Sequence, residues 1–271
     1  MPLLKGITLG QYLPADTYIH SLDPRCKLLL TVLSMILIFL FDSFTAIAMW
    51  ASMTALLAAK SKIPAGTLMR SAKPVLILII LTSILHIFFT GGGKIIFSIG
   101  PLRASGEGTV TALRMGLRLS LLVLFTAILT FTTSPSELSD GLESALAPLR
   151  RFGFPAHEVA MMMTIALRFI PTLFEETERI INAQVSRGAD FQSGGLVRRA
   201  KAYIPVLIPL FVLVFKRADT LASAMEARCY RSGRGRVRMY PLLWGINENR
   251  VLVYYAFFAL AIFLLNRFIP L

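Results

Sequence analysis

The chain has 271 residues, of which 55% are hydrophobic and only 16% are charged. Soluble domains usually carry about 45–50% apolar and about 25% charged residues, so this composition excludes an ordinary soluble protein. The formal net charge is +13. Because no basic run carries interleaved aromatic residues, we interpret this charge as the positive-inside bias of a membrane protein and expect no nucleic-acid partner.

Four apolar blocks in the first half of the chain are expected to cross the lipid bilayer. They cover residues 28–42, 44–59, 74–90 and 109–133. The loop between the second and third blocks carries Lys60, Lys62, Arg70 and Lys73 and no acid. The positive-inside rule therefore places this loop, and with it the N-terminus, in the cytosol.

The loop at residues 91–108 is weakly charged, which suits the outer side of the membrane. Its Gly91–Lys94 stretch lacks the glycine spacing and the following hydroxyl of a nucleotide-binding loop, so we predict a plain turn. In the fourth block, Arg114 and Arg118 lie one turn apart. We expect both side chains to extend toward the outer headgroups, the alternative being that they face protein.

The central residues 134–250 have a different character. They hold 16 of the 28 lysines and arginines and 11 of the 15 acidic residues, in an amphipathic pattern. Ser134-Pro135-Ser136-Glu137 is typical of a helix start, with a serine cap and proline at the first position.

Two long helices should follow, from Ala156 to Arg187 and from Leu196 to Cys229. Prolines should kink them, because a proline removes a backbone hydrogen bond. These are Pro171, Pro205 and Pro209.

A last apolar block at 251–268 completes the predicted fold, an all-α integral membrane protein with about five transmembrane helices. We divide the chain into a membrane region at 1–133 with four spans, a cytosol-facing segment at 134–250 and a final transmembrane helix at 251–271. Five spans from a cytosolic N-terminus leave the C-terminus outside a multi-pass protein of the cytoplasmic membrane.

The two long helices close on the same local pattern. Ser186-Arg187-Gly188 ends the first, and Ala227-Arg228-Cys229 ends the second. Small neighbours would let a partner approach the backbone closely while the guanidinium pairs with a carboxylate. The plainer alternative is that each arginine only compensates the helix dipole. Because the pattern occurs twice, we favour two partner-binding arginines that protrude together on the inner side of the membrane.

At these motifs the sequence closely resembles the transmembrane T component of energy-coupling factor (ECF) transporters, whose signature is a pair of Ala-Arg-Gly motifs on two coupling helices. Both arginines match, whereas Ser186 replaces alanine and Cys229 stands where glycine is common. The resemblance extends over nearly the whole chain through three further segments. They are Tyr18–Leu28 with its Leu22-Asp23-Pro24-Arg25, Ala166–Thr172 and Phe215–Asp219.

The resemblance implies a non-catalytic coupling subunit of an ATP-driven importer of micronutrients, either vitamins or metal ions. Its partners would be two cytosolic ATPase subunits bound through Arg187 and Arg228, and a membrane substrate-binding S component. ATP and Mg would be used by the ATPases, and this chain would bind no cofactor or metal. The length and the Cys229-bearing motif favour the shared, vitamin-type form of the family.

Two further groups of residues have open interpretations. Met161, Met162 and Met163 are a candidate contact with the S component, since flexible methionines adapt to several partners, but lipid or intramolecular packing explains them equally well. Glu175, Glu176 and Glu178 could include a general acid or base. We interpret them as surface charges or ion pairs.

Two other classes of function are alternatives, a membrane-embedded enzyme and a stand-alone secondary carrier. The enzyme is disfavoured because the apolar blocks contain almost no acids and no catalytic motif. The carrier is disfavoured because the polar residues concentrate in one central segment rather than in duplicated halves.

Overall fold

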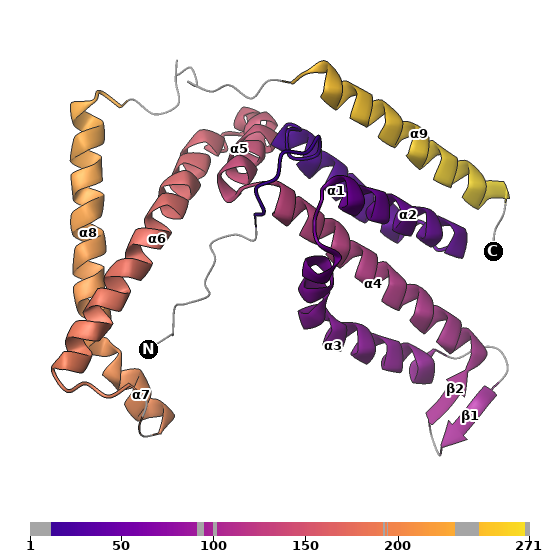
Figure 1. Ribbon diagram of the computed structural model, residues 1–271, viewed down its shortest axis with the longest axis horizontal. Coiled ribbons are helices and arrows are strands. Elements are labelled where there is room, and N and C mark those ends of the chain that lie inside the picture. Colours follow the sequence, from indigo (N-terminus) through magenta and orange to yellow (C-terminus); the bar gives the residue numbers. More distant parts are fainter. Residues whose placement is uncertain are drawn as a thin grey trace. The chain divides into compact units, whose positions relative to one another are not determined.

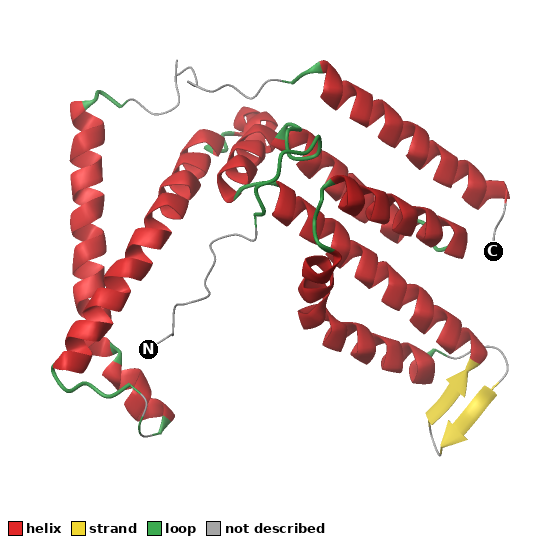
Figure 2. Ribbon diagram, in the orientation of Figure 1, coloured by secondary structure: helices red, strands yellow, loops and turns green. Residues whose placement is uncertain are grey.

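A computed structural model of the protein describes residues 12–90, 95–99, 102–191, 193, 195–230 and 244–268. Within these residues the protein is almost entirely helical, as predicted for an all-α membrane protein (Figures 1 and 2). The chain divides into two compact units. One comprises Met1–Leu9 and Leu142–Tyr240, and the other comprises Gly10–Gly141 and Pro241–Leu271.

The unit formed by Gly10–Gly141 and Pro241–Leu271 holds the apolar helices. They are α1 (Pro24–Leu40), α2 (Phe44–Lys60), α3 (Ala65–Phe89), α4 (Gly106–Thr132) and α9 (Ile246–Phe268). Of the helices described, those at Ala65–Phe89, Gly106–Thr132 and Ile246–Arg267 are long and apolar enough to cross a membrane, and Phe44–Lys60 is a shorter apolar helix.

Side-chain caps explain why the first two helices begin where they do. The Asp23 carboxylate accepts a hydrogen bond from the Arg25 N–H, and Pro24 occupies the first turn of α1. The Ser43 hydroxyl accepts from the Ala46 N–H at the start of α2. The short break between these helices therefore follows from local sequence.

The third helix begins earlier than the apolar pattern predicts. α3 starts at Ala65, so Arg70 and Lys73 lie on its first turns instead of in a loop, and Pro74 lies inside the helix. The prediction was wrong here because hydropathy locates the stretch that lipid can surround, whereas a helix continues as far as its backbone hydrogen bonds allow.

A two-stranded hairpin separates α3 from α4, where only a turn was predicted. β1 (Ile95–Ile99) pairs antiparallel with β2 (Leu102–Ser105). The β-branched and aromatic residues of β1 are the sequence signal for the strand. Residues 91–94, where the turn itself was predicted, lie outside the described residues.

An aromatic cluster around Trp50 joins α2, α4 and α9. The Trp50 ring lies 5.7 Å from Phe125, 6.2 Å from Tyr255 and 5.2 Å from Phe258, measured between ring centroids. The Trp50 side chain is only 1% exposed. Large aromatic rings thus hold three helices that are far apart in the sequence.

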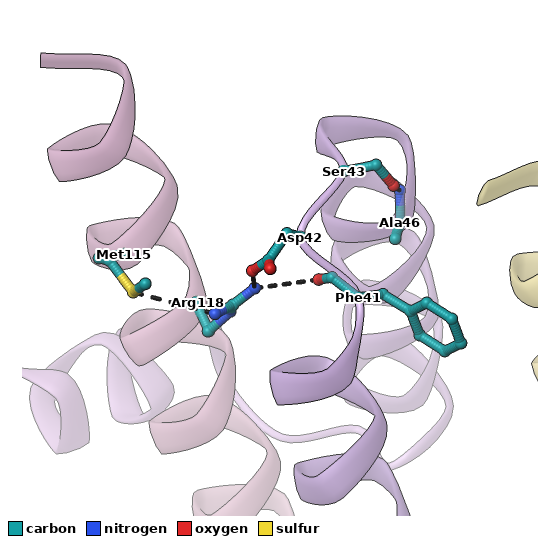
Figure 3. A network of polar contacts seen from close by, with 6 residues as sticks. All are labelled: Phe41, Asp42, Ser43, Ala46, Met115 and Arg118. Carbon is teal, nitrogen blue, oxygen red and sulfur yellow. Dashed lines mark hydrogen bonds and ion pairs between the residues drawn. The ribbon is translucent and has the colours of Figure 1, made fainter. Parts of the chain in front are cut away.

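Arg118 corrects the expectation that the α4 arginines extend to the headgroups. Its side chain is 3% exposed and donates to the Phe41 carbonyl at 3.0 Å and to the Asp42 carboxylate (Figure 3). Phe41 is the C-cap of α1, so the guanidinium stabilises the negative end of that helix. Arg114 also faces protein, with its guanidinium 4.9 Å from the centre of the Phe44 ring. Sequence alone could not supply these partners because they lie on another hairpin.

The remaining helices belong wholly or partly to the other unit. They are α5 (Pro135–Leu146), the 3-10 helix η1 (Ala147–Phe152), α6 (Ala156–Ser186), α7 (Leu196–Ala202) and α8 (Ile204–Ala227). The predicted start of α5 is confirmed. Ser134 and Glu137 exchange hydrogen bonds between side chain and backbone in both directions, at 3.1 and 3.3 Å.

The first predicted long helix is confirmed as α6, but the second is interrupted. α7 ends at Ala202, and α8 begins at Ile204 with Pro205 in its first turn. Pro205 has no N–H to continue the hydrogen bonds of α7, so the chain restarts a helix at this point. Pro171 and Pro209 remain inside α6 and α8.

Candidate functional site

Helices α6 and α8 form an antiparallel pair (Figure 1). Glu176 on α6 pairs with Arg217 on α8 at 2.9 Å. Toward the end of α6, the Gln184 amide lies 3.5 Å from the carbonyl of Pro205, at the beginning of α8. The C-terminus of one helix therefore lies beside the N-terminus of the other.

This arrangement separates the two motif arginines. We call Ser186-Arg187-Gly188 the α6 tip and Ala227-Arg228-Cys229 the α8 tip, and all six residues are exposed. Because the helices are antiparallel, the tips lie at opposite ends of the pair. Arg187 and Arg228 therefore do not lie side by side, and their common position on the inner side of the membrane stays a prediction.

The two tips have the same backbone structure. At the α6 tip, the Gly188 N–H donates to the Val185 carbonyl at 2.9 Å, and the Ala189 N–H donates to the Gln184 carbonyl at 2.9 Å. This pair of bonds, with Arg187 as the C-cap, defines a Schellman motif.

The α8 tip repeats these bonds with different side chains. The Cys229 N–H donates to the Glu226 carbonyl at 2.8 Å, and the Tyr230 N–H donates to the Met225 carbonyl at 3.0 Å. Arg228 is again the C-cap. Both arginines therefore leave the helix at the same position of the same cap.

The cap supplies a conformational reason for the third residue of each motif. Gly188 has φ +89° and Cys229 has φ +52°, both in the left-handed region. Glycine adopts this region without penalty, whereas a side chain is strained in it. The small residue was predicted to allow close approach by a partner, and the left-handed backbone is a further reason for it that the motif alone does not reveal.

The guanidinium groups of Arg187 and Arg228 are available to a partner. Neither makes an ion pair or a hydrogen bond within the described part of the chain. Each also lies at the negative end of its helix, so the dipole interpretation of the arginines remains compatible with the geometry. An exposed, unpaired guanidinium presents a planar set of donors that matches a carboxylate.

The glutamates of α6 are surface charges or ion pairs, as we interpreted them. Glu176 contacts Arg217 at 2.9 Å and Arg179 at 3.7 Å. Glu175 and Glu178 are exposed. Among the described residues no group of histidine, cysteine, aspartate and glutamate has the arrangement of a metal site.

The three methionines lie on the first half of α6 and differ in exposure. Met161 is half-buried, while Met162 and Met163 are exposed. A second apolar surface, which the sequence analysis did not identify, runs along α8. It comprises Ile204, Ile208, Phe211 and Phe215, each about half exposed or more. Their spacing of three to four residues is the helical period that could have revealed it.

Two features define the class of this protein. Several helices are long and apolar enough to cross a membrane, and the α6–α8 pair presents two similar arginine tips. It is an integral membrane protein with two exposed cationic helix ends. The model of a protein family described as "CbiQ: Cobalt transport protein" matches residues 15–240. The chain belongs to this family of transmembrane T components of ECF transporters, as curated relatives also show.

The relatives are similar over nearly their whole length. The energy-coupling factor transporter transmembrane protein EcfT of Acidaminococcus fermentans is 51% identical over 263 residues, covering 97% of this chain and 98% of the relative. EcfT of Thermanaerovibrio acidaminovorans is 50% identical over 248 residues, covering 92% of each chain. EcfT of Bacillus subtilis is 41% identical, covering 97% of this chain and 100% of the relative. The chain is therefore a membrane component of an ECF transporter.

Proposed function

We propose that this chain couples ATP hydrolysis in two cytosolic ATPase subunits to movement of a membrane S component during uptake of a micronutrient. The ATPases would bind ATP and Mg, and this chain would bind neither. The supporting observation is the pair of exposed tips with identical Schellman caps at opposite ends of one helix pair. Two equivalent tips facing different directions suit two related ATPase subunits, one on each tip.

The residues that would contact the ATPases are those of the α6 and α8 tips. Arg187 and Arg228 would each enter a groove of an ATPase and pair with a carboxylate, while the cap keeps the neighbouring backbone compact. Antiparallel helices tied by the Glu176–Arg217 ion pair would move together as one lever.

The exposed apolar surface of α8 supports an S component as the second partner. Ile208, Phe211 and Phe215 lie on one side of a helix whose other contacts include α6. An apolar stripe of this kind is typical of an interaction or lipid-facing surface. We propose that it binds the S component together with Met161, Met162 and Met163.

The proposed topology has a cytosolic N-terminus and an outside C-terminus in the cytoplasmic membrane. It rests on the basic residues before and within the start of α3. In this scheme residues 1–133 form the first membrane region, 134–250 the coupling segment and 251–271 the last span. The Cys229-bearing motif favours the shared, vitamin-type form, with a metal ion as the alternative substrate.

Co-purification from bacterial membranes tests this function. The wild-type chain should retain two different ATPase subunits, and the Arg187→Ala/Arg228→Ala variant should lose both while still inserting into the membrane. Each single variant should retain one subunit more strongly than the other. Arg199→Ala, at an exposed arginine of α7, is the matched control and should bind like the wild type. Full ATPase binding by the double variant would contradict the proposal.

A further inference from the structure

The first turn of α1 is bound to the first turn of α9 through one buried carboxylate. Glu248 Oε1 accepts a hydrogen bond from the Asp23 N–H at 3.3 Å, and Glu248 Oε2 accepts from the Gly245 N–H at 2.9 Å. Both Asp23 and Glu248 are 6% exposed. One carboxylate thus accepts hydrogen bonds at the positive ends of two helices, α1 and α9.

The same region is bound to the end of α4 by a buried ammonium group. Lys27 is 6% exposed, and its Nζ donates to the Thr132 carbonyl at 3.0 Å and to the His20 carbonyl at 2.8 Å. Thr132 is the last residue of α4, so the ammonium lies at the negative end of that helix. The charges of all three helix ends are therefore complemented inside one buried cluster.

Helix α5 also lies against the first turn of α1. A Cβ built on Gly141 would lie 3.5 Å from the Pro24 carbonyl carbon and 3.6 Å from the Arg25 nitrogen. Alanine would therefore fit at this position in ordinary contact, whereas a larger side chain would force α5 away from α1. Gly141 itself is buried.

These contacts flank, in the sequence, the segment that carries the two tips. Leu142–Tyr240 belongs to the other compact unit. Gly141 is the last residue of the membrane-helix unit before this segment, and it packs on Pro24. After the segment, the chain rejoins the membrane-helix unit, where Glu248 binds Asp23. Gly141 and Glu248 therefore both contact the same helical turn, Asp23-Pro24-Arg25.

We propose that this turn is the fixed anchor of the coupling segment and that Glu248 is its positioning residue. The inference rests on the proposed function. When ATP moves α6 and α8, the anchor holds Gly141 and Glu248, which flank the coupling segment, in place. The movement is then transmitted to the membrane helices and is not absorbed by the connecting residues. Buried charge-assisted hydrogen bonds suit this role because they are strong and have fixed geometry.

Amide hydrogen exchange on the complete complex with its ATPases, in nanodiscs of phosphatidylethanolamine and phosphatidylglycerol, tests the anchor. In the wild type, ATP should change exchange at the α6 and α8 tips and leave the Asp23 and Gly245 amides protected. In Glu248→Gln, these two amides should exchange roughly ten-fold faster, as expected on loss of a charge-assisted hydrogen bond, and mainly when ATP is present. Glu107→Gln, the same change at an exposed glutamate in the first turn of α4, should behave as the wild type.

The dependence on ATP separates an anchor from a helix cap that is only structural. The anchor would be overturned if the Asp23 and Gly245 amides of Glu248→Gln exchanged equally fast with and without ATP. It would also be overturned if ATP reduced the protection of the Asp23 amide in the wild type. In either case, ATPase binding at the tips would leave the proposed function intact. Failure of the wild type to bind the ATPases would defeat the proposed function itself.

If Glu248→Gln does not accumulate in the membrane, variants of Gly141 test the anchor instead. Gly141→Leu should show the ATP-dependent exchange at Asp23 and Gly245, and Gly141→Ala should not. Identical exchange in these two variants would overturn the anchor.

Discussion

Glu176 and Arg217 form an ion pair of 2.9 Å that lies eleven residues before each motif arginine along its own helix. At 1.5 Å per residue, each tip extends about 16 Å beyond the pair, in opposite directions. The pair is therefore the contact from which Arg187 and Arg228 are equally distant along the two helices.

Breaking this pair should loosen α6 from α8. Both side chains are partly shielded from solvent, so a double-mutant cycle of Glu176→Gln and Arg217→Gln should give a coupling energy of about 1 kcal/mol. Thermal unfolding of the purified chain in detergent measures it. Glu178→Gln, at an exposed glutamate of the same helix, should change stability much less. Strictly additive effects of the two changes would contradict a stabilising pair.

The third residues of the two tips should respond oppositely to substitution. Gly188→Ala forces a Cβ into the left-handed region and should destabilise the α6 cap by about 1 kcal/mol. Cys229→Gly removes an existing Cβ from that region and should stabilise the α8 cap by a similar amount, about 1 kcal/mol. Exchange rates of the Ala189 and Tyr230 amides report each cap.

Gly195 provides the control for these cap variants. It has φ −70°, and no atom lies within 4 Å of the position that an added Cβ would take, so Gly195→Ala should have little effect. Effects of the same sign at Gly188 and Cys229 would show that the caps do not govern these positions.

Arg118→Met should destabilise the membrane helices by about 2 kcal/mol. The change leaves the Phe41 carbonyl without its donor in a buried place. Asp42→Asn should cost less than about 1 kcal/mol, because the Asp42 side chain is 67% exposed. Unfolding in mixed micelles with increasing SDS provides the comparison, and equal losses for both variants would refute the capping role.

Trp50→Ala should cost about 3–5 kcal/mol by leaving a cavity between α2, α4 and α9. Trp50→Phe should cost much less, since a ring still fills most of the space and Trp50 Nε1 makes no hydrogen bond within the described residues. The same SDS titration distinguishes the two. Similar losses for alanine and phenylalanine would mean that the cluster does not depend on filling by the ring.

The amino-acid sequence was sufficient for several features that depend on neighbours along the chain. It predicted the membrane class, the approximate helices, the Ser134–Glu137 helix start and the paired arginine motifs, because hydropathy, caps and helix ends are local properties. It also led to the T-component family, to which the comparisons show that the chain belongs.

Only the tertiary structure decided which distant groups meet. It gave Arg118 the C-cap of α1 as its partner, set Arg187 and Arg228 at opposite ends of an antiparallel pair, and joined Glu248 to Asp23. The physical reason is that a buried polar group must find a hydrogen-bond partner wherever packing brings one, and packing brings together residues such as Asp23 and Glu248, which the chain separates by 225 positions.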